Sequence, residues 1–296
     1  MIRFPKETDY FLDMDACFAE EERAKYVLMK VPYDGTSTFI KGADKGPEAI
    51  IAASDSLELY DVVYGIEAYS SGIYTDSPAL DFSTPERMAE SVYQKTISHI
   101  KREKIVGLLG GEHSVSIGAI RAASEEFDHL SILQIDAHAD LRESYHESPY
   151  NHACVMRRAQ QYGKVVQVGI RSVCAEEKIN IVEENIFYAH EIVGKNPEWM
   201  QRVCDQLTEN VYLTIDLDGL DPSVMPATGT PLPGGLHWHE LLNLLQLIIK
   251  NKQLVGFDVV ELCPQPENAV SDVLAATLVY KMITMNEFYH NFPKFA

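Results

Sequence analysis

Short apolar runs alternate along the chain with longer amphipathic stretches. The runs are nearly continuous in aliphatic residues, which is typical of strands buried on both faces. They predict strands at Tyr26–Val31, Ile105–Leu109, Leu130–Ile135, Val165–Ile170, Val211–Ile215 and Leu254–Val260, with a weaker one at Ile186–Tyr188. Alternation of such runs with helices favours one parallel sheet that has helices on both faces.

The stretches between these runs carry helix signals. They predict helices at Pro47–Leu57, Pro85–Arg102, Ser114–Phe127, Pro197–Thr208 and Trp238–Lys250, and a long C-terminal helix from near Ala269. Three of these helices begin at a proline, which is tolerated in the first turn. Ser83 or Thr84 and Asn196 stand where a capping side chain is expected.

The excess of acidic residues indicates which kinds of partner the protein can bind. The 296 residues include 25 Lys and Arg against 44 Asp and Glu, so the net charge is −19. Nucleic acids and anionic membranes attract basic surfaces, and both are therefore disfavoured as partners. Cationic substrates and divalent metals are the partners that such a field attracts.

Cysteine usage and the N-terminus favour a cytoplasmic protein. The five cysteines are scattered and form no C-x-x-C pair, so neither a disulfide framework nor a cysteine zinc site is expected. The segment MIRFPKETDYF lacks the apolar run of a signal peptide. The most apolar helix, around Leu241–Ile249, is too short to span a bilayer.

Three predicted strands run directly into groups that can bind a metal. SILQI leads into D-A-H-A-D at 136–140, VYLTI into D-L-D-G-L-D at 216–221, and IVGLL into G-G-E-H-S at 110–114. Ligands of open α/β sheets bind beyond the carboxyl ends of the strands. In extended chain, alternate residues face the same way, so the polar groups of each motif converge.

The combined charge of these groups calls for cations. Four aspartates and two histidines near one strand end repel one another unless positive charge neutralises them. Two divalent ions supply the +4 that the aspartates balance, and mixed oxygen and nitrogen ligands suit Mn²⁺, Zn²⁺ or Fe²⁺. We therefore expect a two-metal site with ions about 3.5–4 Å apart. A turn with a capping aspartate is the alternative for D-x-H-x-D alone, and an EF-hand is excluded because Gly219 is misplaced.

Taken together, the motifs resemble those of a known family. GGEHS, IDAHADLR, TIDLDGLDPS and FDVVELCP, in this order, resemble the ureohydrolases, which include arginase and agmatinase. GADKGPEAI at 42–50 resembles the agmatinase branch, and the resemblance runs from about Pro32 to the C-terminal helix. It implies a single domain over residues 1–296, a three-layer α/β/α sandwich with a mainly parallel sheet of about eight strands, two Mn²⁺ ions, and a homo-oligomer (trimer or hexamer).

The resemblance also implies a ligand set. The first ion would be held by His113, Asp136, Asp140 and Asp216, and the second by Asp136, His138, Asp216 and Asp218. Asp136 and Asp216 would bridge the two ions. A water molecule shared by two such ions loses a proton near neutral pH, and the resulting hydroxide would attack the guanidinium carbon.

Three residues match the family's catalytic positions. Asp140 would hold the hydroxide, Glu261 would bind the guanidinium, and His152 would carry a proton to the leaving amine. Glu261 could instead orient a ligand histidine, and His146 is a rival of His152. The other histidines are expected at the surface or at helix caps: His99, His129, His190, His237, His239 and His290.

The loop 141–151 bears on the substrate. It lacks the Asn- and Thr/Ser-rich pattern of arginases and resembles agmatinases, and its two glutamates suit a substrate with an amine at its far end. We therefore expect hydrolysis of agmatine to putrescine and urea, a step of polyamine biosynthesis. Aminopropyl-agmatine, guanidinobutyrate and arginine remain open, and so does formiminoglutamate, which Arg142 could serve unless it pairs with Glu143 or Glu147. Two other classes remain: a one-metal zinc hydrolase of the deacetylase type, and a non-catalytic binding protein.

Overall fold

A parallel sheet forms the centre of the computed structural model, which describes residues 9–291. Within that range the sheet has eight strands in the order β2-β1-β3-β8-β7-β4-β5-β6, and every neighbouring pair is parallel. The strands are β1 (Tyr26–Val31), β2 (Ile73–Asp76), β3 (Ile105–Gly110), β4 (Leu130–Ile135), β5 (Lys164–Ile170), β6 (Ile186–Tyr188), β7 (Asn210–Asp216) and β8 (Gln253–Val260). All seven predicted strands are confirmed. The four-residue edge strand β2 was missed.

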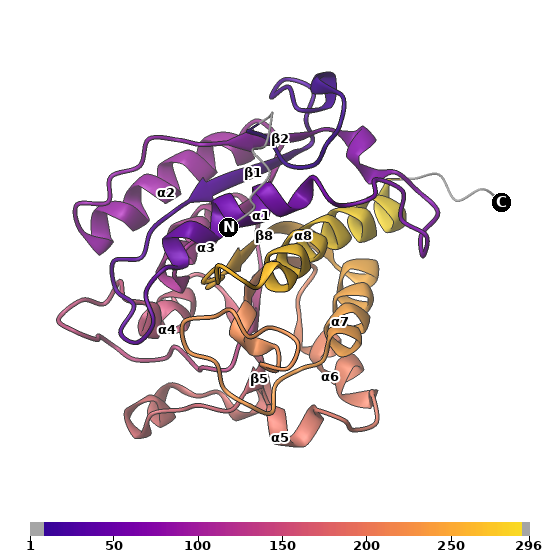
Figure 1. Cartoon of the computed structure of the whole chain (residues 1–296). Coiled ribbons are helices and arrows are strands. Elements are labelled where there is room, and N and C mark those ends of the chain that lie inside the picture. The colour runs from indigo at the N-terminus through magenta and orange to yellow at the C-terminus, as the bar shows by residue number, and fades with distance from the viewer. Residues whose placement is uncertain (1–8, 292–296) are drawn as a thin grey trace.

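Helices cover both faces of this sheet (Figure 1). They are α1 (Gly46–Ser54), α2 (Pro85–Ile100), α3 (Ser116–Glu126), α4 (Val155–Ala159), α5 (Ala189–Ile192), α6 (Glu198–Gln206), α7 (Trp238–Asn251) and α8 (Ala269–His290). One buried cluster joins the sheet to α1, α6, α7 and α8, and a second joins it to α2, α3 and α4. The predicted three-layer α/β/α architecture is therefore confirmed.

Two details of the helix ends follow from hydrogen bonding. Thr84 caps α2 as predicted, because its hydroxyl accepts from the backbone N–H of Arg87. The predicted cap Asn196 is wrong: α6 begins at Glu198, Pro197 occupies the N-cap position, and no side chain caps there.

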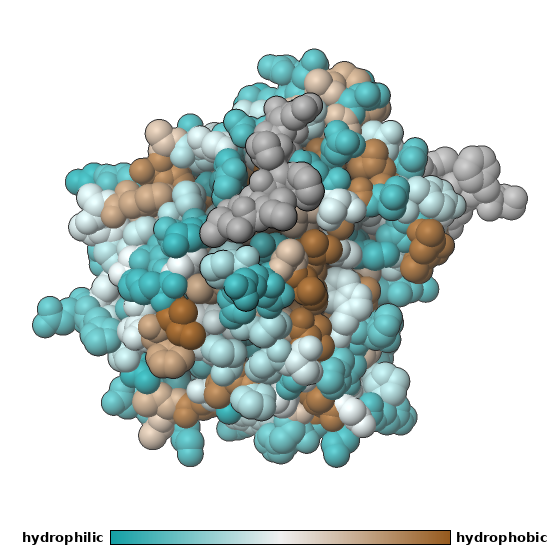
Figure 2. Space-filling view, viewed as in Figure 1, coloured by the Kyte–Doolittle hydropathy of each residue, from teal (hydrophilic) through white to brown (hydrophobic). Residues whose placement is uncertain are grey.

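One face of the molecule is mostly hydrophilic. Figure 2 shows hydrophilic residues over most of the visible face, with hydrophobic residues in separate patches. Among the described residues, no helix is both long and apolar enough to cross a membrane.

The strand order brings the motifs together. β3, β8, β7 and β4 are consecutive neighbours at the middle of the sheet, and these are the strands that lead into GGEHS, the 258–263 segment, D-L-D-G and D-A-H-A-D. Ile135 pairs with Ile215 and Asp216 with Val260, so the strands end at nearly the same level. Their carboxyl ends therefore place four chemically active segments side by side.

Candidate metal centre and active site

Tight turns orient Asp136 and Asp216, the first aspartates after β4 and at the end of β7. Asp136 Oδ1 accepts from the His138 backbone N–H at 2.6 Å, and Asp216 Oδ1 accepts from the Asp218 N–H at 2.9 Å. These side-chain bonds bend the chain as soon as each strand ends. Gly219 lets the two turns meet, because a Cβ there would lie 2.8 Å from the Asp136 nitrogen.

The first group of candidate ligands surrounds His113. Its Nδ1 lies 3.1 Å from Asp136 Oδ2, 3.0 Å from Asp140 Oδ2 and 3.4 Å from Asp216 Oδ2. All four residues are buried. His113, Asp136 and Asp140 together form one cluster with the spacing of a metal site.

A second group lies next to the first. His138 Nδ1 is 3.0 Å from Asp218 Oδ2 and 3.6 Å from Asp136 Oδ1, and these three residues form a second cluster with metal-site spacing. Asp136 thus turns one oxygen to each cluster, which is the arrangement of a bridging carboxylate. The structure brings all six predicted ligands together. Their roles as ligands, and the bridging roles of Asp136 and Asp216, stay predictions.

The protonation state of His113 fits a metal ligand. Its Nε2 lies 2.8 Å from Thr214 Oγ1, and the Thr214 hydroxyl donates to Asp258 Oδ1 at 2.7 Å. Because that hydroxyl proton is already donated, Nε2 carries a ring proton, and in the neutral ring Nδ1 is therefore the nitrogen with the free lone pair. Nδ1 is buried without a hydrogen-bond partner, facing three carboxylate oxygens. A divalent cation is the group that this donor set lacks.

The pKa shifts in the cluster also indicate that it needs positive charge. Burial raises the pKa of Asp216 well above its usual value, and Asp218 and Asp136 raise it further. Burial and then Asp136 likewise raise the pKa of Asp140, to about 7. Burial lowers the pKa of His138, but Asp218 and Asp136 outweigh it and bring the value to about 11. In the absence of bound cations, the site is therefore short of positive charge.

A cavity of about 180 Å³ opens onto this centre. Glu261, Asp140 and His152 all line it, together with His113, His138 and Asp216. Glu261 follows β8, and its backbone N–H donates to the Gly111 carbonyl. Its backbone is left-handed, with a φ of 64°. Its Oε1 accepts from the His113 backbone N–H at 2.8 Å. Glu261 therefore contacts the backbone of His113 and not its ring. The His113 ring is oriented by Thr214 instead.

The two candidate proton carriers differ in position. His152 lines the cavity of the metal centre, whereas His146 lines a neighbouring open cavity beside Thr36 and Ser148. The Tyr145 ring is close to both, with its centroid 4.3 Å from that of His146 and 6.1 Å from that of His152. This placement supports His152, and its role stays a prediction.

Two expectations about other residues are wrong. Arg142 was expected to pair with Glu143 or Glu147, but the Glu143 carboxylate binds Arg157 and Arg158, and the Arg142 guanidinium lies over the Tyr145 ring at 4.4 Å.

His99 was expected at the surface or at a helix cap. It is buried on α2, and its Nε2 lies 2.8 Å from Asp76 Oδ2 at the end of the missed strand β2. His237, at the N-cap of α7, does match that expectation.

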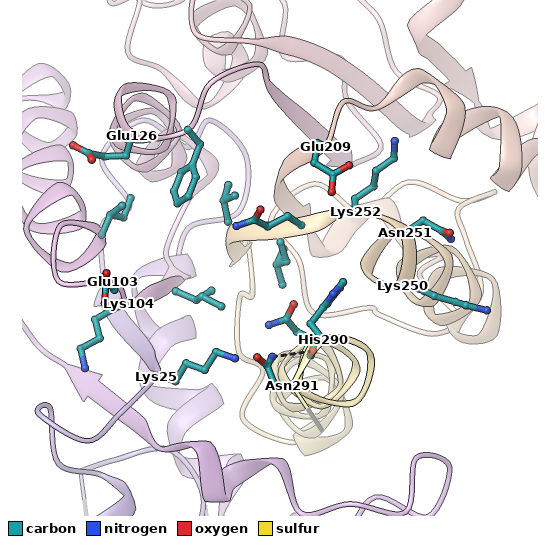
Figure 3. Close-up of a pocket in the computed structure, with 17 residues that line it drawn as sticks. Lys25, Glu103, Lys104, Glu126, Glu209, Lys250, Asn251, Lys252, His290 and Asn291 are labelled. Atoms are coloured by element: carbon teal, nitrogen blue, oxygen red, sulfur yellow. Dashed lines mark hydrogen bonds between the residues drawn. The ribbon is translucent and has the colours of Figure 1, made fainter. Parts of the chain in front are cut away.

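A larger cavity, of about 790 Å³, lies at the amino ends of β3 and β8, away from the metal ligands (Figure 3). Four of its polar side chains are already hydrogen bonded. Lys25 binds Glu287, Lys104 binds the Ala24 carbonyl, Lys252 binds the Leu207 carbonyl and His290 binds the Ile249 carbonyl. Size alone therefore does not identify the reactive site.

Sequence reasoning missed the residues that support the ligands. Besides Thr214 and Asp258, Gln134 donates to Asp136 Oδ2 at 2.6 Å, and the Arg171 guanidinium binds the backbone carbonyls of Asp218, Leu220 and Leu232. Gln134 and Asp258 are fully buried polar residues inside apolar strands. That mismatch with strand composition was the available signal.

Comparisons with known proteins agree with this geometry. Residues 24–284 match the model of the Arginase family, whose members are binuclear metal enzymes. The chain is 38% identical over 295 residues to the N(1)-aminopropylagmatine ureohydrolase of Synechocystis sp., covering 95% of each, and 32% identical over 280 residues to the agmatinase of Pyrococcus horikoshii, covering 93% and 96%. The crystal structure of the agmatine ureohydrolase of Thermoplasma volcanium superposes with a TM-score of 0.84 at 33% identity, covering 92% of this chain and 94% of that one. The chain belongs to the arginase family and is a ureohydrolase, a hydrolase that acts on guanidino substrates.

Proposed function

We propose that this protein is a binuclear manganese amidinohydrolase that hydrolyses an agmatine-type guanidine to urea and an amine. One observation carries the proposal. His113 presents an unpartnered Nδ1 to three carboxylates, in a cavity that also holds Glu261 and His152. His113, Asp136, Asp140 and Asp216 would hold one ion, and Asp136, His138, Asp216 and Asp218 the other. Oxygen-rich ligation without thiolates supports Mn²⁺.

Two divalent cations bound there would polarise a water molecule and make it nucleophilic at neutral pH. The protein's own groups would do the rest. Glu261 would accept paired N–H groups of the guanidinium and fix its carbon within reach of the water. Asp140 would accept a hydrogen bond from that water and so orient it. His152 would transfer a proton to the leaving nitrogen as the C–N bond breaks.

The substrate's far end separates two candidates. Agmatine, which would yield putrescine, is the sequence-based expectation. N(1)-aminopropylagmatine, which would yield the corresponding triamine, is favoured by the names of relatives that are 35–38% identical. The Pyrococcus horikoshii agmatinase and the Thermoplasma volcanium agmatine ureohydrolase are 32% and 33% identical. Both substrates are cationic at the far end, in keeping with the net charge of −19.

A substrate panel tests the proposal. We would load the purified protein with Mn²⁺ and measure kcat/KM for agmatine, N(1)-aminopropylagmatine, guanidinobutyrate, arginine and formiminoglutamate by urea or formamide release. We expect one of the two cationic substrates to exceed the three carboxylate-bearing ones by about a hundredfold or more, because a mismatched charge is costly to bury. Preference for a carboxylate substrate would overturn the assignment and would implicate Arg142.

Metal content distinguishes the remaining enzyme class. Elemental analysis of the full chain should give two metal ions per chain, whereas one tightly held zinc would favour a deacetylase-type hydrolase. A chain that binds two ions and hydrolyses none of the five compounds would be a binding protein instead. The single domain over residues 1–296, the trimeric or hexameric assembly, the cytoplasmic location and a place in polyamine biosynthesis remain predictions of the same proposal.

A further inference from the structure

A hydrogen-bonded chain of three residues lies behind His152. Glu112 follows β3, Thr36 lies in the loop after β1, and His152 opens a short 3-10 turn, His152–Cys154. Thr36 Oγ1 lies 2.8 Å from Glu112 Oε1, 3.0 Å from the His152 backbone nitrogen and 3.2 Å from His152 Nδ1. One hydroxyl group therefore contacts a carboxylate, an amide and an imidazole.

Glu112 determines the direction of these bonds. Its side chain is fully buried, and its two oxygens accept from the Thr36 and Ser114 backbone N–H groups and from the Ser114 hydroxyl. A backbone N–H can only donate, so both oxygens of Glu112 accept, and Oε1 accepts from the Thr36 hydroxyl as well. The single hydroxyl proton of Thr36 is therefore donated to Glu112. The lone pairs of Thr36 Oγ1 are left to accept from His152.

We propose that Thr36 and Glu112 are positioning residues that hold the His152 ring with its proton on Nδ1, so that Nε2 exchanges protons with the reacting groups. The inference rests on the proton-carrying role of His152 given in the proposed function. Neutral imidazole carries one ring proton, and the other nitrogen is then the acceptor. Because Thr36 takes the Nδ1–H, Nε2 is left for the cavity that His152 lines.

The proton balance of the step follows from this arrangement. Nε2 takes up the proton released as water adds to the guanidinium carbon, and His152 becomes an imidazolium with Nδ1–H still on Thr36. When the C–N bond breaks, its electron pair goes to the leaving nitrogen, which takes the Nε2 proton. The remaining O–H proton is lost to solvent as the carbonyl of urea forms, and the free amine takes up a proton from solvent. The ring returns to its starting tautomer. The Tyr145 ring packs edge-on against the imidazole, with its centroid 6.1 Å away.

The test uses the full-length protein with a hydroxyl-specific set of variants. Thr36→Val removes the hydroxyl and keeps the shape, Thr36→Ser keeps the hydroxyl, and Glu112→Gln keeps the size but removes the charge. We would label the histidines with ¹⁵N, load the protein with diamagnetic Mg²⁺, and assign the His152 ring signals as those missing from His152→Asn. Melting temperatures would show that each variant is folded.

We expect Nδ1–H in the wild type and in Thr36→Ser, and a shift toward Nε2–H in Thr36→Val. A positioned acid or base contributes about 10²–10⁴-fold to rate. With Mn²⁺, kcat should therefore fall about tenfold or more in Thr36→Val and Glu112→Gln, and less than about threefold in Thr36→Ser, with little change in KM. The pH profile of kcat should shift in Thr36→Val and stay as in the wild type in Thr36→Ser.

Two results would overturn the inference: Nε2–H in the wild type, or unchanged tautomer and kcat in Thr36→Val. The failure of the proposed function has a different signature. Unchanged kcat in His152→Asn would remove His152 from the reaction, whatever its tautomer. Absence of any amidine hydrolysis in the wild type would reject the enzyme assignment, and the NMR result would still decide whether Thr36 sets the ring proton.

Discussion

Asp140 combines a special backbone with a reactive side chain. Its φ is 52°, in the left-handed region that Asn and Asp adopt more readily than other non-glycine residues, and its Oδ2 lies 3.0 Å from His113 Nδ1. Asp140→Asn should therefore keep the fold and remove a charge from the metal centre. We expect kcat to fall by about a hundredfold or more, in the range of one lost acid–base or electrostatic group.

The measurement is kcat together with bound metal per chain and the melting temperature. If Asp140→Asn turned over at a rate near that of the wild type, Asp140 would have no part in the mechanism. Low activity with the metal retained would assign the loss to the orientation of the water, whereas low activity with lost metal would assign it to ligation by Asp140.

Thr214 matters through the ring of His113. It accepts from His113 Nε2 and donates to Asp258, whose other oxygen accepts from Tyr212 OH at 2.9 Å. Thr214→Val keeps the shape and removes this link, so the His113 ring loses its fixed tautomer. Loss of such a partner typically weakens metal binding about 10–100-fold.

Calorimetric titration with Mn²⁺ checks this prediction. Thr284→Val is a matched control, because Thr284 is also fully buried but its hydroxyl donates to Tyr280 within α8. The control should bind Mn²⁺ as the wild type does. Equal affinities in all three proteins would show that the His113 tautomer does not depend on Thr214.

At the level of the elements, the sequence predicts the long, strongly patterned segments and misses most of the short ones, although the three-residue strand β6 was predicted. The central strands are apolar on both faces, and every one of them was predicted. Strand β2 and helices α4 and α5 have only four or five residues, which gives too few periods for a pattern. The helix expected from Ser114 instead opens with a 3-10 turn at His113–Val115, because the Glu112 carboxylate caps the Ser114 N–H.

In the candidate site too, some residues could be predicted from the sequence and others could not. Its six candidate ligands follow strand ends and could be recognised in the sequence. The groups that orient them could not, since Thr214, Asp258 and Arg171 act across strands or through backbone carbonyls. Such contacts depend on strand order, which a single sequence does not reveal.

The loop between β7 and α7 depends on one aspartate. Asp221 accepts from the backbone N–H groups of Ser223, Gly234 and Gly235. Although burial raises the pKa of Asp221, hydrogen bonds from these three residues lower it to about 2. A carboxylate whose pKa is lower in the folded state stabilises the fold above its unfolded value, near 4, and this stabilisation is lost as the pH falls toward 2.

Asp221→Asn should therefore unfold more easily than the wild type at pH 7, by about 1 kcal/mol, a value reduced for the partial exposure of this side chain. The difference should shrink between pH 4 and pH 2. Urea unfolding at several pH values measures it, and Asp205→Asn, on the exposed side of α6, is the control. A difference between Asp221→Asn and the wild type that did not vary with pH would contradict this account.

For the whole molecule, the metal centre is a property of the complete sheet. His113 and Glu261, which share a hydrogen bond, are 148 residues apart, and the six candidate ligands come from segments after β3, β4 and β7. Their charges are uncompensated until cations bind. Metal binding should therefore stabilise the entire fold, by about 4 kcal/mol for each site at a free concentration a thousandfold above Kd.

Asp216 gives this coupling a sharp test. Burial and the neighbouring Asp218 and Asp136 raise its pKa well above the usual value, so its ionised form is unfavourable in the metal-free protein. Asp216→Asn should leave the metal-free melting temperature unchanged or raise it, while Mn²⁺ should raise the melting temperature much less than in the wild type. A tenfold weaker site corresponds to about 1.4 kcal/mol less stabilisation.

Thermal unfolding with and without Mn²⁺ measures both effects, with Asp205→Asn as the exposed control. If Mn²⁺ stabilised Asp216→Asn as strongly as the wild type, Asp216 would not be a metal ligand.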